Sequence, residues 1–137
     1  MAHVLELEIN GDVYSFKAGF AFIREIEPMK KQKQNGVEQD VGLNYILAGI
    51  YDGDPDALLT ALDVMNKEQK PRLKKSEIEG YIEECEDVEG LFEKVLGFLS
   101  TANCTKKKVN KFLQMAKNLE ADQEAKSRVG GNSTGNA

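Results

Sequence analysis

Residues 5–17 read LELEINGDVYSFK, and this stretch predicts a β-hairpin spanning Val4 to Lys17. Apolar and polar residues alternate on both sides of an Asn-Gly-Asp turn, as expected for two strands with one buried face. The apolar face consists of Leu5, Leu7, Ile9, Tyr14 and Phe16. A lone hairpin is only marginally stable in water, so this face must pack on the helices that follow.

The turn leaves two registers open. If Asn10-Gly11 forms the turn, Leu7 faces Tyr14; if Gly11-Asp12 forms it, Ile9 faces Tyr14 instead. Both pairs supply the positive-φ residues that tight hairpin turns need. The same apolar face results either way, because both registers keep the side chains in phase.

The remainder of the chain is predicted to form six short helices, identified by apolar residues at helical spacing and by capping residues. They are expected at about residues 19–27 and 41–51, after the Asp54-Pro55-Asp56 cap, after a Ser76/Glu79 capping box, after Asp87, and from Thr105 to about Lys126. The polar stretch Met29 to Asp40 is expected to be a loop or frayed turn, and Lys67 to Lys75 a polar linker. The fold class is therefore α+β, mainly α.

The chain has 137 residues, the size of one compact domain. We expect that domain to occupy residues 1–126. Residues 127–137, SRVGGNSTGNA, are small, polar and Gly-rich, and are expected to form a flexible, disordered tail.

Charge is unevenly distributed along the chain. Between Ser76 and Lys94 there are eight acids and one base, whereas Thr105 to Lys117 contains five lysines and no acid. Such blocks are usually solvated helix faces, but they can also pair within the fold or with a partner of opposite charge. The candidate protein-contact residues are Lys106, Lys107, Lys108, Lys111, Glu83 and Glu84. We expect contacts between neighbouring copies, the acidic block of one meeting the basic block of the next.

The residues give no basis for catalysis or for a cofactor. The one histidine, His3, stands beside the N-terminus, and no Gly-rich phosphate cradle is present in the sequence. We therefore expect no catalytic, cofactor-binding or metal residues and no enzyme activity. Cys85 and Cys104 lack metal-ligand spacing and are expected to be buried or half-buried free thiols. Asp52 to Asp56 departs from a calcium loop and fits a turn with a helix cap.

Nucleic acid and membrane are also disfavoured as partners. The net charge is −5 and the pI about 5.0, and no run of about 18 apolar residues is present. A small nucleic-acid-binding regulator acting through Lys106 to Lys111 is kept as an alternative. With no signal peptide apparent, we expect a cytoplasmic protein.

Three stretches in order resemble the tail assembly chaperone family of long-tailed bacteriophages (siphophages) and related prophages of Gram-positive hosts. The stretches are LEINGDVYSFKAGFAFIREIE (7–27), NGVEQDVGLNYILAGIYDGDPDALLTAL (35–62) and SEIEGYIEECEDVEGLFEKVLGFLSTANCTKKKVNKF (76–112). Each alone is a hairpin, a cap or an amphipathic helix, and it is their order and lengths that carry the resemblance.

The resemblance implies a role in virion morphogenesis. Family members bind and solubilise the tape measure protein and give way as the tail tube protein polymerises around it. The protein is then expected in the cytoplasm of the bacterial host during assembly, and absent from the mature virion. Self-association is expected from the charge blocks and not from the resemblance. A structural or tail-completion protein retained in the virion is the other alternative.

Overall fold

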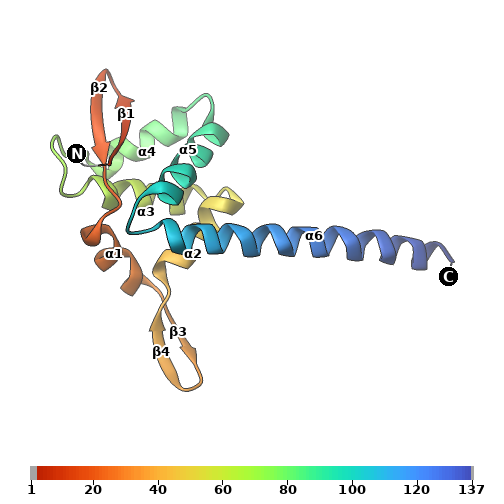
Figure 1. Ribbon diagram of the computed structural model, residues 1–137. Helices are drawn as coiled ribbons and strands as arrows, with labels where there is room; N and C mark the ends of the chain where they lie inside the picture. The colour runs from red at the N-terminus through yellow and green to blue at the C-terminus, as the bar shows by residue number, and fades with distance from the viewer. Residues whose placement is uncertain (1–2, 137) are drawn as a thin grey trace.

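The computed structural model describes residues 3–136, with side chains described as far as Glu124. In this part of the chain two β-hairpins and six α-helices follow one another in sequence (Figure 1). The predicted mainly α, α+β class is confirmed.

The first hairpin pairs β1 (Leu5–Ile9) with β2 (Asp12–Phe16) in antiparallel fashion. Leu7 lies opposite Tyr14, which is the register set by an Asn10-Gly11 turn. Both turn residues have positive φ, 55° and 88°, as a tight hairpin turn requires. The structure thus decides between the two registers that the sequence left open.

The hairpin packs on the helices as expected. Phe16 is fully buried, and Leu5, Leu7 and Ile9 are buried on the same face, while Tyr14 is half-buried. Directly after β2, the backbone N–H of Lys17 donates to the carbonyl of Met65 at 2.9 Å. The hairpin is therefore fixed to the body by both apolar contact and a main-chain hydrogen bond.

A second hairpin corrects the expectation of a loop between Met29 and Asp40. Here β3 (Lys31–Gln34) pairs with β4 (Val37–Asp40), and all eight residues are exposed. Asn35 and Gly36 form the turn, with φ of 54° and 77°. Because neither strand buries an apolar face, the sequence shows none of the alternation that reveals a half-buried strand.

Helices make up the rest of the fold. They are α1 (Phe20–Ile26), the short 3-10 helix η1 (Glu27–Met29), α2 (Gly42–Asp52), α3 (Pro55–Asn66), α4 (Lys75–Glu84), α5 (Val88–Thr101) and α6 (Lys106–Asn136). One core joins them to the first hairpin, and its fully buried side chains include Phe22, Ile26, Leu43, Leu47, Leu58, Leu62, Leu73 and Ile78.

Some predicted caps are present and others are not. The Asp54 and Asp87 side chains accept from the N–H groups of Asp56 and Gly90, as expected. By contrast, the predicted Ser76/Glu79 capping box is absent. The helix α4 begins at Lys75, and it is the side chain of Glu77 that accepts from the backbone N–H of Lys74, at 3.0 Å.

Thr105 precedes α6 as predicted, but its hydroxyl is buried and does not cap the helix. It donates instead to the carbonyl of Leu99 at 2.6 Å, and so ties the start of α6 to the end of α5. Cys85 is half-buried as expected, whereas Cys104, in the α5–α6 connection, is exposed. The prediction for Cys104 was therefore wrong.

The last helix, α6, leaves the body after its first turns and extends away from it (Figure 1). Its helical backbone continues past Lys126, where the sequence predicts its end. The side chains of residues 125–137 lie outside the described part of the chain. The expectation of a flexible tail at residues 127–137, and with it the domain boundary at 126, therefore stays a prediction.

Candidate functional site

The six charged residues singled out from the sequence lie at two separate places. Lys106, Lys107, Lys108 and Lys111 occupy the first turns of α6, and Glu83 and Glu84 the last turn of α4; all are exposed. Among the described residues no salt bridge joins the acidic block to the basic block. The two blocks therefore do not pair with each other within the described part of the fold.

Lys108 differs from its neighbours because the fold uses it. Its Nζ lies 2.6 Å from Oε2 of Glu27, whose carboxylate is mostly buried. The other carboxylate oxygen of Glu27 accepts from the N–H of Leu43 at 2.8 Å, in the first turn of α2. Through its two carboxylate oxygens, Glu27 of η1 therefore binds both the start of α2 and the start of α6.

Lys106 and Lys107 have no such partner among the described residues. Cations at a helix N-terminus oppose the helix dipole, typically at a cost of 0.3–1 kcal/mol each at exposed sites. In the part of the chain that the structure describes, no salt bridge offsets this cost for either lysine, and their role in protein contacts stays a prediction.

A hollow in the described surface lies beside α1, and we call it the α1 hollow. It is lined by Lys17, Gly19, Phe20, Ala21, Phe22, Arg24, Glu25, Val64, Met65, Lys67, Glu68, Gln69 and Cys104. Phe20 is 69% exposed there although it belongs to α1, whose other phenylalanine is buried in the core. The guanidinium of Arg24 lies 5.3 Å from the centre of the Phe20 ring.

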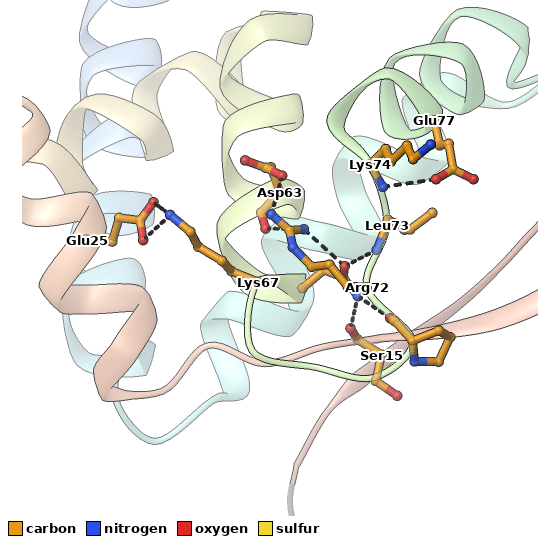
Figure 2. A network of polar contacts seen from close by, with 10 residues as sticks. Ser15, Glu25, Asp63, Lys67, Arg72, Leu73, Lys74 and Glu77 are labelled. Atoms are coloured by element: carbon orange, nitrogen blue, oxygen red, sulfur yellow. Dashed lines mark hydrogen bonds and ion pairs between the residues drawn. The ribbon is translucent and has the colours of Figure 1, made fainter.

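The charges around the α1 hollow are partly neutralised within the fold. Lys67 binds Glu25 at 2.8 Å, and this pair is visible in Figure 2. Lys17 and Arg24 form no salt bridge among the described residues. The lining of the hollow thus mixes apolar and charged side chains, among them the exposed ring of Phe20, the cations Lys17 and Arg24, and the acid Glu68.

A second exposed apolar surface lies on α6. Val109 is buried against the body and Phe112 is half-buried, its ring edge-on to Tyr51 at 5.9 Å between centroids. Further along the helix, Met115 and Leu119 are 57% and 60% exposed. The apolar residues therefore continue where α6 has left the body.

The polar network at the end of α3 is structural. Asn66 is completely buried, accepts from the N–H of Leu73 at 2.7 Å, and donates to the carbonyl of Ser15 at 3.0 Å. Arg72 binds Asp63 at 3.0 Å, as Figure 2 shows. No buried side-chain polar atom among the described residues lacks a hydrogen-bond partner, so the network is explained by its role in fixing the linker before α4.

The acidic turn after α2 is also explained by the fold. Asp54 caps α3, and Gly53 ends α2 with φ of 83°. Among the described residues no group of three or more histidine, cysteine or carboxylate side chains is placed to hold a metal ion.

His3 packs against the body, although the sequence suggests only a terminal residue. Its ring stacks on Phe98 at 5.0 Å, and its Nε2 lies 3.0 Å from the hydroxyl of Thr101. Sequence reasoning also missed Phe20. Helical spacing places Phe20 outside the apolar stripe that Phe22 and Ile26 share, but this alone does not indicate a binding residue.

None of the helices in the described residues has the length and apolar character needed to cross a bilayer. In a comparison with protein families, the model described as phage tail assembly chaperone protein matches residues 6–114. Comparisons with curated proteins and with solved structures gave no match. The matched range runs from β1 into α6 and includes the α1 hollow.

Proposed function

The chain belongs to the phage tail assembly chaperone family, and we propose from this premise that it binds and solubilises the tape measure protein during tail assembly. It acts without catalysis in the cytoplasm of the bacterial host. It gives way as the tail tube protein polymerises, and it is absent from the finished virion.

The physical task is to cover an apolar stripe on a long helix. Such a helix aggregates while its stripe is exposed, and a small protein can cover the stripe with reversible contacts. Many copies on one rod bind with combined strength, yet each can be displaced singly. A tube protein that polymerises along the rod can therefore replace them one after another.

The observation that supports this proposal most directly is the α1 hollow. A phenylalanine exposed to 69% of its surface at the edge of an apolar hollow favours protein binding over a structural role. Lys17 and Arg24 at the edge would attract the acidic flank of an amphipathic helix. We propose that apolar side chains of the tape measure helix insert here.

Co-expression tests the proposal. The wild-type chain should keep a tape measure protein in solution that is insoluble when expressed alone, and should co-purify with it in many copies. Phe20→Asp should abolish both effects, because a carboxylate cannot replace the ring at the edge of the hollow. Val13→Asp is the matched control. Val13 is 55% exposed on the first hairpin and does not line the α1 hollow, so this change should leave solubilisation and co-purification unaffected.

Failure of the wild-type chain to solubilise the tape measure protein would refute the proposal. If Phe20→Asp and Val13→Asp behaved alike, the α1 hollow would not be the binding site. The predicted absence from the particle is tested separately, by mass spectrometry of purified virions. Abundant peptides from this chain would instead indicate a structural protein retained in the tail.

A further inference from the structure

Four residues of α6 form a patch with an internal order. Lys111, Met115, Leu119 and Asp122 are spaced at i, i+4, i+8 and i+11, so all four lie along one face of the helix. All four are exposed. The patch thus reads cation, apolar, apolar, anion along the helix axis, and we call it the α6 patch.

The α6 patch does not serve the packing of α6 on the body. That packing uses Val109, which is buried, and Phe112, whose ring contacts Tyr51. Neither Lys111 nor Asp122 takes part in a salt bridge among the described residues. Two exposed apolar side chains, with a charged residue at each end that forms no salt bridge among the described residues, therefore face away from the fold.

The order of the α6 patch makes it complementary to itself in one orientation only. When two such helices run antiparallel, the cationic end of each meets the anionic end of the other, and the apolar pairs meet in the middle. When they run parallel, lysine meets lysine and aspartate meets aspartate, which is unfavourable. A two-fold interface uses the same patch on both subunits, which is the arrangement that the antiparallel pair provides.

We propose that the α6 patch binds a second copy of this chain, with the two α6 helices antiparallel. Met115 of each copy packs on Leu119 of the other, and Lys111 of each pairs with Asp122 of the other. This arrangement replaces the head-to-tail contact expected from the sequence. In α4 and α5, no large exposed apolar residue accompanies the acidic side chains. In α6, by contrast, the exposed Met115 and Leu119 lie between Lys111 and Asp122.

The dimer should be weak and reversible. Four apolar side chains and two exposed ion pairs give an interface well below the roughly 1,200 Å² of a stable complex. Salt should weaken it further, since exposed charges are screened beyond about 8 Å near physiological ionic strength. Because the α6 patch is separate from the α1 hollow, self-association and tape measure binding can fail independently.

Sedimentation velocity over a range of protein concentrations, at low and at high salt, tests the proposal. The wild-type chain should change from monomer to dimer as its concentration rises, and more readily at low salt. Lys111→Asp and Asp122→Lys should each raise the dissociation constant by roughly tenfold or more, because each places like charges at both ends of the interface.

A mixture of these two variants gives the sharpest result. In an antiparallel heterodimer of Lys111→Asp with Asp122→Lys, both end pairs again carry opposite charges. The mixture should therefore dimerise although neither variant does so alone. A parallel pair in register does not predict this recovery, because there each charged position meets its own counterpart.

Matched controls make the same charge changes elsewhere on α6. Lys117→Asp and Glu124→Lys alter residues on a different face of the helix and should leave the dimer unchanged, with circular dichroism confirming the helix content of each variant. A wild-type chain that stays monomeric at every concentration would overturn the proposal, as would a mixture that fails to recover. Loss of self-association in Glu83→Lys, with Lys111→Asp unaffected, would restore the head-to-tail arrangement.

Discussion

Replacing Asn66 by alanine should destabilise the protein by roughly 2–4 kcal/mol. The buried amide of Asn66 makes four contacts. Its Oδ1 accepts from Leu73 N at 2.7 Å and from Arg72 Nη1 at 3.1 Å, and its Nδ2 donates to the carbonyls of Ser15 at 3.0 Å and Pro71 at 3.3 Å. One side chain therefore connects the end of α3, the linker before α4 and the first hairpin.

The four contacts do not contribute equally. The N–H of Leu73 is buried, and leaving such a donor without a partner costs about 1–3 kcal/mol. The carbonyls of Ser15 and Pro71 are only partly buried and can bind water, so their loss adds less. Arg72 keeps its contact with Asp63. For a chain of this size the sum corresponds to a melting temperature lower by about 10 °C.

Thermal and urea unfolding followed by circular dichroism provide the assay. Asn66→Asp keeps the acceptor but loses the donor and buries a carboxylate, so its deficit should shrink as falling pH protonates that group. Asn110→Ala is the matched control, since Asn110 is exposed and makes a single 3.2 Å contact with Ser100. If Asn66→Ala melted at the temperature of the control, the network would not be a stabilising element and this reasoning would be wrong.

Three further changes have definite expected outcomes. Phe16→Ala removes a fully buried ring and should lower the free energy of unfolding by about 3–5 kcal/mol, measured by urea denaturation. Lys108→Glu places a second carboxylate beside Glu27 and should destabilise the fold by about 1 kcal/mol or less, since the lysine is half exposed. Deleting residues 127–137 should leave the melting temperature nearly unchanged, because few apolar residues there can pack.

Two exposed positions serve as controls for these changes. Val13→Ala, on the outer face of the same hairpin, should alter stability far less than Phe16→Ala does. Lys107→Glu should be neutral or slightly stabilising, because an acid at a helix N-terminus is favoured by the helix dipole. Equal melting temperatures for Lys107→Glu and Lys108→Glu would mean that the contact of Lys108 with Glu27 does not stabilise the fold. A melting temperature lower by several degrees after deletion of residues 127–137 would mean that these residues pack on the body.

Elements with a buried face were predictable from the sequence, and elements without one were not. The first hairpin, α2 and α3 follow from apolar periodicity joined to Asn-Gly and Asp-Pro signals, and the structure has them within one or two residues. In the second hairpin only Asn35-Gly36 carries a signal, because no residue of β3 or β4 is buried. Such a pair should be taken as a hairpin turn even between polar strands.

The candidate site was less predictable, because its properties depend on tertiary contacts. Four lysines of α6 look alike in the sequence, yet Lys108 pairs with Glu27, 81 positions earlier, while Lys111 forms no salt bridge with any side chain that the structure describes. Likewise, the hollow beside the exposed Phe20 is lined by residues from the end of α3, which lie more than 40 positions later in the chain. Spacing predicts which residues share a face, but it does not predict what lies opposite that face.

The second hairpin has a consequence for contacts between copies of this chain. A two-stranded sheet has an open edge on each side, and open edges recruit strands from other chains into aggregates. Here those edges carry Lys31, Lys33, Glu38 and Asp40, with Lys31 held by Asp40 at 2.6 Å. Adding a strand would bring charges together and, apart from Val37, would bury little apolar surface, so these edges favour strand addition only weakly. Molecules of this chain that meet at these edges should therefore separate again.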